Sequence, residues 1–318
     1  MNSDTAIPQA PPQPSAQTEP APLTTLTAAR RKPLSRDHLS AICMVLPSIF
    51  AIALFVYGFI AWNGWASLTN WRGLGTMNQV GPIRFPAADF AGLNNYDRLF
   101  HTDRFLTDLS NNGIFTVFFL GGCVVLGMAL AVMIDRQVRG ETFFRNVYLF
   151  PMALSFVVTG TIWRWVFLQL GWVTDPKLAL PALIIAAIWQ ESGFTMAMFL
   201  AALRGIPDEL REAARVDGAT EFQIYRKVIL PLINPVILSA LIILAHLSLK
   251  IFDLVYVMTG GSPTLGYVTD MPSLYLFQLA FQDNLFARAA AVAMIMLGFV
   301  AVVIVPYLWT NLRREVAR

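Results

Sequence analysis

Four ionisable side chains interrupt long apolar stretches of this sequence. Glu191 lies near the middle of one stretch, and His246, Lys250 and Asp253 follow one another along the next. Steps of four and three residues predict that the last three share one face of a helix. Such groups can neutralise one another in pairs, line a water-filled cavity or relay protons. In a membrane each of them costs free energy, so an ionisable residue there indicates a structural or functional role.

Other chemistries are absent from the sequence. It has no phosphate-binding GxxxxGK[ST] loop, no HExxH, GxSxG or CxxC pattern and no metal-ligand spacing among His38, His101 and His246. Cys43 and Cys123 lie in different apolar stretches and are expected to be small buried residues. We therefore expect a chain that is not an enzyme, with no catalytic residue, no metal and no cofactor of its own, and with no nucleic-acid partner.

The composition indicates an integral membrane protein. Of 318 residues, 56% are apolar and 14% are charged, and the mean hydropathy is +0.57. Soluble domains carry roughly 25% charged residues. Two cysteines in a chain of this length also exclude a disulfide-rich secreted scaffold.

Six segments are long enough to cross a bilayer as helices, which needs about 20 apolar residues. They are residues 41–62, 113–134, 147–170, 178–203, 232–257 and 289–310. The predicted fold is all-α, with a six-helix membrane domain over residues 38–318 and a cytoplasmic loop over 204–231. Residues 1–37 are rich in proline and are predicted to form a disordered cytoplasmic tail.

The basic residues predict the orientation. Of 23 lysines and arginines, 15 fall in segments on one side of the six spans and 5 on the other. Because cytoplasmic loops carry the excess of lysine and arginine, both termini are expected in the cytoplasm. Residues 63–112 would then form an outer loop, which could fold as a cap or lie on the membrane.

The cytoplasmic loop carries signals for two short helices. Pro207 suits a first helical turn, and Gly218 should end that helix. Thr220 and Gln223 have the spacing of a capping box that starts a second helix. The alternative is a solvated charged loop, which would leave the apolar Phe222 exposed.

This hairpin resembles the EAA motif of ABC-importer permease subunits. Glu212-Ala213-Ala214 is followed after three residues by Gly218, and later by Leu230-Pro231, with Val228 where the family has isoleucine. The resemblance implies a coupling helix that docks on a cytoplasmic ATPase. The residues that it assigns to coupling are Glu212, Ala213, Ala214, Asp217, Gly218, Leu230 and Pro231.

The resemblance also implies partners and a location. They are a second homologous permease subunit, an ATPase dimer that holds ATP and Mg, a periplasmic or lipid-anchored sugar-binding protein, and the lipid of a bacterial cytoplasmic (inner) membrane. The flanks Ile206-Pro207, Asp217–Ala219 and Thr259–Pro263 resemble the carbohydrate-importer branch. Residues Lys250–Thr259 and Val268–Pro272 are similar to glucose or mannose importers.

On this interpretation the intramembrane charges line a sugar pathway, because sugars are bound by groups that hydrogen-bond hydroxyls and by aromatic rings. The substrate-binding candidates are Trp189, Gln190, Glu191, Phe194, His246, Lys250, Phe252 and Asp253. Gly193 could loosen its helix where the ligand approaches. Alternatively, the charges are structural, with Lys250 paired to Asp253 or to Glu191.

Other functions fit parts of the pattern. The cargo could be a monosaccharide such as glucose or mannose, an oligosaccharide such as maltose or trehalose, or another solute such as an amino acid. A secondary transporter could use Glu191, His246 and Asp253 as a proton relay, and a membrane scaffold or sensor would need no pathway. Neither of the last two explains the EAA hairpin.

Overall fold

The computed structural model describes residues 36–73, 77–80, 83–86, 88–135, 140–260 and 267–316. The chain divides into two units, Met1–Phe55 and Val56–Arg318. The first contains helix α1 (Arg36–Ile52) and the start of the π-helix η1 (Ala53–Gly58). The predicted tail lies almost wholly outside the described residues, and α1 begins at Arg36.

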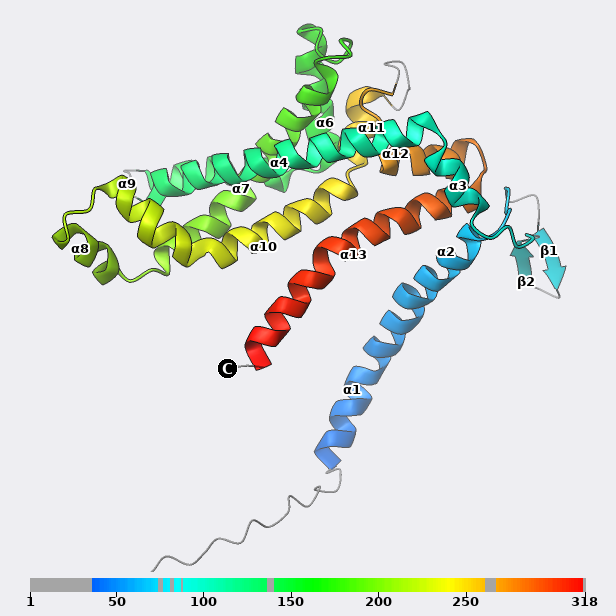
Figure 1. Ribbon diagram of the computed structural model, residues 1–318, viewed down its shortest axis with the longest axis horizontal. Helices are drawn as coiled ribbons and strands as arrows, with labels where there is room; N and C mark the ends of the chain where they lie inside the picture. The colour runs from blue at the N-terminus through cyan, green and yellow to red at the C-terminus, as the bar shows by residue number, and fades with distance from the viewer. Residues whose placement is uncertain are drawn as a thin grey trace, which may run out of the picture. The chain divides into compact units, whose positions relative to one another are not determined.

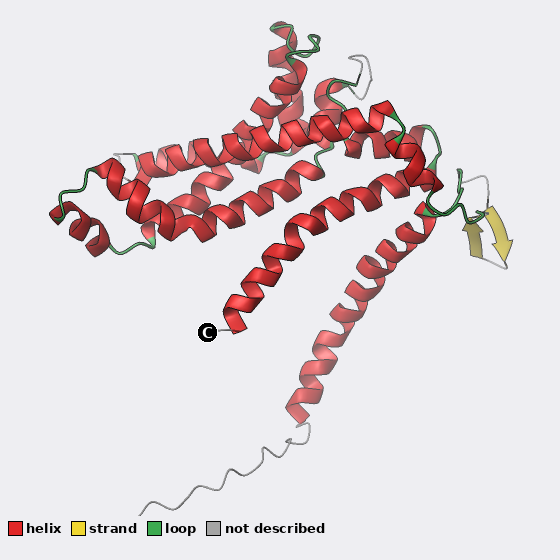
Figure 2. Cartoon of the chain, viewed as in Figure 1, coloured by secondary structure: helices red, strands yellow, loops and turns green. Residues whose placement is uncertain are grey.

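The second unit is nearly all helical, as predicted (Figures 1 and 2). Its strands form one short antiparallel hairpin, β1 (Met77–Val80) with β2 (Ile83–Pro86), in which Met77 pairs with Pro86. The α-helices are α2 (Phe59–Ser67), α3 (Asn94–Phe100), α4 (Asp103–Asp135), α5 (Glu141–Leu149), α6 (Phe156–Gln169), α7 (Ala179–Arg204), α8 (Asp208–Val216), α9 (Glu221–Ile224), α10 (Leu230–Leu249), α11 (Asp253–Thr259), α12 (Pro272–Phe277) and α13 (Phe286–Val316). A 3-10 turn, η2 (Pro151–Ala153), and two π-helices, η3 (Tyr225–Ile229) and η4 (Gln278–Gln282), complete the described elements.

Five helical segments are long and apolar enough to cross a membrane. They are Met44–Ser67, Asp103–Asp135, Ala179–Arg204, Glu221–Leu249 and Phe286–Tyr307. A sixth crossing exists if the bent pair Glu141–Ala153 and Phe156–Gln169 is one span. The six predicted spans therefore correspond to helical segments, although α4 begins ten residues before its predicted span at residue 113.

The third predicted span is not one straight helix. Its two halves meet at 99°, between Ala153 and Phe156. Ser155 starts α6 by accepting a hydrogen bond from the Val158 N–H. The Gln190 Nε2 on α7 donates to the Leu154 carbonyl at the break, at 3.0 Å. This bond meets the requirement that non-helical backbone at membrane depth finds a partner within the protein.

The fifth predicted span also ends early, so the prediction that His246, Lys250 and Asp253 share one helical face is wrong. Helix α10 ends at Leu249, and Asp253 begins the separate helix α11. Side chains from elsewhere bind the carbonyls around this break. Asn112 donates to Ser248 O, and Ser273 donates to Ile251 O.

Helices α4 and α7 pack closely along their lengths through small residues. A Cβ on Gly127 would lie 2.2 Å from the Thr195 hydroxyl, which itself donates to the Cys123 carbonyl at 2.9 Å. A Cβ on Gly193 would lie 2.1 Å from the Tyr148 carbonyl of α5. The absence of a side chain at Gly193 therefore allows the α5 backbone to approach α7, and its suggested role near a ligand stays a prediction.

Three buried apolar clusters hold the second unit together. One joins α4, α6, α7 and α11, and includes Phe115 and Leu254. A second joins the far end of α4 and α7 to α9 and α10, and includes Phe199 and Ile224. A third joins α3, the start of α4, α12 and α13 around Phe105. Helix α4 takes part in all three clusters.

The close approach at Gly193 gives a test of this packing. Gly193→Ala must push α5 and α7 apart, because the new methyl group meets backbone rather than a movable side chain. We expect a loss of about 1–3 kcal/mol in stability, the usual cost of overpacking. Thermal unfolding of the detergent-solubilised protein would measure it.

Gly121→Ala on α4 is the matched control, since nothing lies within 4 Å of its Cβ. It should unfold at the temperature of the unmodified protein. Equal melting temperatures for Gly193→Ala and Gly121→Ala would contradict the close packing of α5 on α7.

Candidate functional site

The hairpin between α7 and α10 consists of α8 and α9, joined at Gly218. Gly218 has φ +78°, a left-handed conformation that costs other residues energy. Its N–H donates to Arg215 O, and the Ala219 N–H donates to Ala214 O. These two bonds form a Schellman motif, which satisfies the last carbonyls of α8. The predicted end of this helix is confirmed.

The second helix of the hairpin begins with the predicted capping box. The Thr220 hydroxyl accepts from the Gln223 N–H, and the Gln223 side chain accepts from the Thr220 N–H. From α9 the chain continues through η3 into α10 without leaving the helix. Leu230 and Pro231 are the first residues of α10. Because Pro231 lacks an N–H, the wider π-turn before it accommodates the missing helical bond.

Helix α8 presents a mixed apolar and charged surface. Glu212 and Ala213 are exposed, Val216 is 87% exposed, and Phe222 at the start of α9 is 72% exposed. Ala214 instead packs on the buried cluster at this end of the protein. Ala213 therefore lies on the outer surface of the hairpin, whereas Ala214 contributes to its packing on the rest of the protein.

A buried ion pair fixes α8 to the end of α4. Arg211 Nη1 donates to Asp135 Oδ2 at 2.8 Å, with 16% and 6% of the two side chains exposed. Arg211 also donates to the Leu203 carbonyl, and Tyr225 donates to the same Asp135 oxygen at 3.2 Å. Burial lowers the pKa of Arg211, but Asp135, together with Tyr225 and Asp208, raises the pKa overall, so the guanidinium stays charged.

Glu212 stands on the rim of a polar hollow of about 530 Å³ beside this ion pair. Arg211, Arg215 and Glu221 also line the hollow, and Arg215 is paired to Glu221 at 3.0 Å. Among the described residues, none makes an ion pair or hydrogen bond to the Glu212 carboxylate. The Glu212 side chain is exposed at this hollow.

The four candidates on α7 have different surroundings. The Gln190 amide holds the break at Leu154, and the Trp189 ring meets the Trp163 ring edge-on at 5.7 Å. Glu191 and Phe194 are half-buried. In the part of the chain that the structure describes, Glu191 has no ion-pair partner. Gln190 and Trp189 thus have packing roles, while the Glu191 carboxylate has none.

The four candidates near the α10–α11 break are dispersed. Lys250 and Asp253 are exposed, and His246 is half-buried. Phe252 packs in an aromatic cluster with Tyr256 and Phe277, at centroid distances of 5.4 and 5.1 Å. The predicted pairs of Lys250 with Asp253 and with Glu191 do not form within 4 Å in the described structure, so the structural alternative for these charges is not supported.

A polar cluster that the sequence analysis missed lies at the other end of α4. Arg104 donates through Nε and Nη2 to Asp270 Oδ2, at 3.1 and 2.6 Å, and also to the Gln278 side chain. Its guanidinium lies between the rings of Tyr267 and Tyr275, at 4.2 and 4.7 Å. The separation of 166 residues between Arg104 and Asp270 hides this contact from local patterns.

The same cluster positions the segment that leads into α12. Asn111 donates to the Tyr267 and Asp270 carbonyls, and Tyr267 has φ +65°. Asp108 is fully buried beside these groups. Of the Thr259–Pro263 motif, residues 261–263 lie outside the described residues.

The geometry defines a class of protein: a polytopic membrane protein whose spans carry a structured helical hairpin at one face. Residues 123–314 match the family described as the inner membrane component of binding-protein-dependent transport systems. The chain belongs to this family. It is a transport component and not an enzyme, and the match decides against the secondary-transporter and scaffold alternatives.

Two relatives illustrate the chain's place in this family. The chain is 39% identical over 304 residues to a probable ABC transporter permease protein of Pyrococcus horikoshii, covering 90% of this chain and 99% of that protein. It is 36% identical over 275 residues to the xylose/arabinose import permease protein of Haloferax volcanii, covering 81% and 83%.

The fold is also known from experiment. The crystal structure of a bacterial ABC transporter that imports the acidic polysaccharide alginate contains a similar chain, with TM-score 0.69 and 23% identity. The match covers 90% of this chain and 98% of that one. This likeness supports the arrangement of helices described here.

The Arg211–Asp135 pair yields a prediction about the hairpin. Arg211→Gln leaves the buried Asp135 carboxylate without its cation, which typically costs about 3–5 kcal/mol. We expect α8 to detach from α4 while the spans stay folded. Hydrogen exchange over residues 208–225 should rise strongly, because local opening exposes those amides.

Arg215→Gln is the control, since its pair with Glu221 is about half exposed on both sides. Such surface pairs contribute roughly 0–1 kcal/mol. Comparable exchange in the two variants would show that Arg211 does not anchor the hairpin.

Proposed function

We propose that this chain is the membrane-spanning permease subunit of an ATP-driven sugar importer, with its α8–α9 hairpin as the coupling element. The observation that carries the proposal is the hairpin itself. Its EAA residues fall on a helix that ends in a Schellman turn at Gly218, and its Glu212 carboxylate has no partner among the described residues. A short exposed helix with a small side chain at Ala213 and a charge at Glu212 would suit a groove on another protein.

The proposed coupling path runs from α8 into the membrane. Movement of a docked ATPase would displace α8, and the Arg211–Asp135 pair would pass this displacement to α4. Gly218, Leu230 and Pro231 would set the angle at which α9 enters α10. Asp217, the C-cap residue of α8, would hold the turn.

The proposed complex supplies what the chain lacks. An ATPase dimer would hold ATP and Mg, a second permease subunit would complete the pathway, and a periplasmic or lipid-anchored binding protein would deliver the sugar. Both termini and the hairpin would face the cytoplasm. A solved relative, the alginate transporter, was crystallised with an alginate-bound periplasmic protein, which supports the last of these partners.

A sugar is the cargo best supported by the relatives. Besides the xylose/arabinose permease, they include a permease protein of the glucose import system of Saccharolobus solfataricus, 27% identical over 296 residues. We propose a monosaccharide such as glucose or mannose. An oligosaccharide is the alternative, because another relative, from Thermoanaerobacterium thermosulfurigenes, is named as a probable permease for starch degradation products, at 29% identity.

The first test is to purify the complex and assay uptake. The chain would be tagged at Arg318, extracted in mild detergent, and its copurifying proteins identified by mass spectrometry. An ATPase and a second permease are expected, and the reconstituted complex with its binding protein should import labelled sugar only with ATP. Sugar uptake without ATP, or ATP-driven uptake restricted to amino acids, would contradict the proposal.

The coupling residues give a sharper prediction. Glu212→Lys and Gly218→Val should each abolish ATP-dependent uptake while leaving membrane insertion intact. The first reverses the charge presented to the ATPase, and the second strains the left-handed turn. Uptake by vesicles, normalised to permease content, is the measurement.

Gly205→Ala in the same loop is the control, because its backbone has φ −79° and its Cβ meets no atom closer than 3.4 Å. It should transport normally. Normal uptake in both Glu212→Lys and Gly218→Val would remove the coupling role from this hairpin.

Glu191 is the substrate candidate that the structure leaves without a packing role. Glu191→Gln should lower sugar uptake at least about tenfold, as loss of a hydrogen bond to a charged group does, while ATPase binding persists. Gln190→Leu should instead destabilise the protein, since the Gln190 amide donates a hydrogen bond to the Leu154 carbonyl at the break before α6. Loss of the assembled complex in Glu191→Gln would show that Glu191 is structural.

A further inference from the structure

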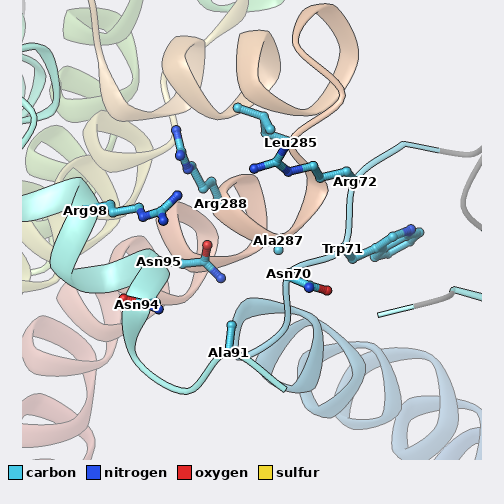
Figure 3. Close-up of a pocket in the computed structure, with 10 residues that line it drawn as sticks. All are labelled: Asn70, Trp71, Arg72, Ala91, Asn94, Asn95, Arg98, Leu285, Ala287 and Arg288. Atoms are coloured by element: carbon cyan, nitrogen blue, oxygen red, sulfur yellow. The ribbon is translucent and has the colours of Figure 1, made fainter. Parts of the chain in front are cut away.

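Three arginines from separate segments meet in one pocket of the second unit. Arg72 follows α2, Arg98 lies on α3 and Arg288 lies in the first turn of α13. Figure 3 shows their guanidinium groups turned toward the same space, with the Asn95 side chain beneath them. The pocket has a volume of about 130 Å³. Since a water occupies about 30 Å³, it has room for a small polar group.

The pocket walls are fixed by hydrogen bonds. Asn95 is buried and donates to the Ser67 and Thr69 carbonyls, at 2.8 and 2.7 Å. The Ala287 N–H donates to Trp71 O, which joins α13 to the segment after α2. The segments that carry the three arginines are therefore joined before any ligand arrives, and a preformed site loses less entropy on binding.

Two of the pocket arginines, Arg98 and Arg288, make no ion pair with the described residues. Within the described ranges no carboxylate lies within 4 Å of the guanidinium of Arg98 or Arg288. Like charges held close together repel, so an anion that bridges them is stabilised. Arginine is well suited to phosphate, because its planar fork can donate two parallel hydrogen bonds.

The pocket lies where two candidate membrane spans end and begin, which is where lipid headgroups are expected. The candidate spans Met44–Ser67 and Phe286–Tyr307 end and begin at its walls, and each is only slightly longer than the hydrocarbon core requires. Trp71 stacks on Phe286 at 5.0 Å beside it, and tryptophan is enriched at membrane interfaces. This is the face opposite the α8–α9 hairpin, because α4 runs about 50 Å from α3 to Asp135.

We propose that this pocket binds the phosphate of an anionic lipid headgroup at the membrane face opposite the hairpin. Arg98 and Arg288 would donate to the phosphate oxygens, and the acyl chains would lie along the apolar surface below. A free phosphate ion has the same chemistry and is the second source to be distinguished. An acidic side chain of a partner protein is the competing occupant.

The test compares lipid binding in variants of equal charge. The full chain, with its copurified subunits, would be titrated with phosphatidylglycerol and observed by native mass spectrometry. Arg98→Gln with Arg288→Gln should weaken phosphatidylglycerol binding at least about tenfold. Arg145→Gln with Lys177→Gln removes the same charge away from the pocket and should bind like the unmodified protein.

Inorganic phosphate distinguishes the sources. If the site serves lipid, millimolar phosphate should displace little phosphatidylglycerol; if it serves the free ion, phosphate alone should bind, and binding should be lost in the pocket variant. Should the double variant not be recovered, Arg98→Gln alone carries the test, because its side chain is exposed and surface substitutions usually change stability little.

Two results would overturn the proposal. One is equal binding of phosphatidylglycerol and of phosphate by the pocket variant and the control. The other is unchanged lipid binding together with loss of binding to the sugar-binding protein or to another subunit, which would assign the arginines to an acidic side chain of that partner.

Discussion

The close packing of α4 on α7 is the contact on which the rest of the second unit depends. Lipid is as apolar as leucine, so helices in a bilayer gain little from burying apolar side chains against one another. They associate where small residues let backbones approach, as at Gly127 against Thr195. The hydroxyl of Thr195 then bonds across the interface to Cys123 O. Packing at this seam brings all three buried clusters together, because each of them includes residues of α4.

Polar contacts at its two ends connect α4 to the hairpin on one side and to the segment before α12 on the other. Near its first turn Arg104 holds Asp270, and at its last residue Asp135 holds Arg211. Both pairs are largely buried and both are reinforced by tyrosines. A displacement of the hairpin is therefore resisted by a charge contact rather than by a flexible loop. The segment before α12 is fixed to the opposite end of the same helix.

The structural features that depend on neighbouring residues could be predicted from the sequence. Hydropathy identified the segments long enough to cross a membrane, and the Gly218 turn and Thr220 capping box follow from local chemistry. The sequence was insufficient for the helix breaks at Leu154 and after Leu249. A continuous apolar run looks the same whether straight or broken, and the groups that permit the breaks, Gln190 and Asn112, lie far away in the chain.

In the candidate site, too, local features could be predicted from the sequence and long-range contacts could not. The EAA residues could be placed on their hairpin because their spacing is short. The ion pairs that anchor it join residues 76 positions apart, and those near α12 join residues 166 apart. The grouping of His246 with Asp253 failed because it assumed an unbroken helix. What each candidate binds stays a prediction.

The two broken helices differ in when their stabilising partners are made. At the break after Leu249, Asn112 is synthesised 136 residues before its partner Ser248, and Ser273 follows 22 residues after its partner Ile251. The break at Leu154 is completed by Gln190, which emerges 36 residues later. The Leu154 carbonyl therefore gains its partner only after the fourth helix has been made. During biogenesis the third and fourth segments must settle in the bilayer as a pair.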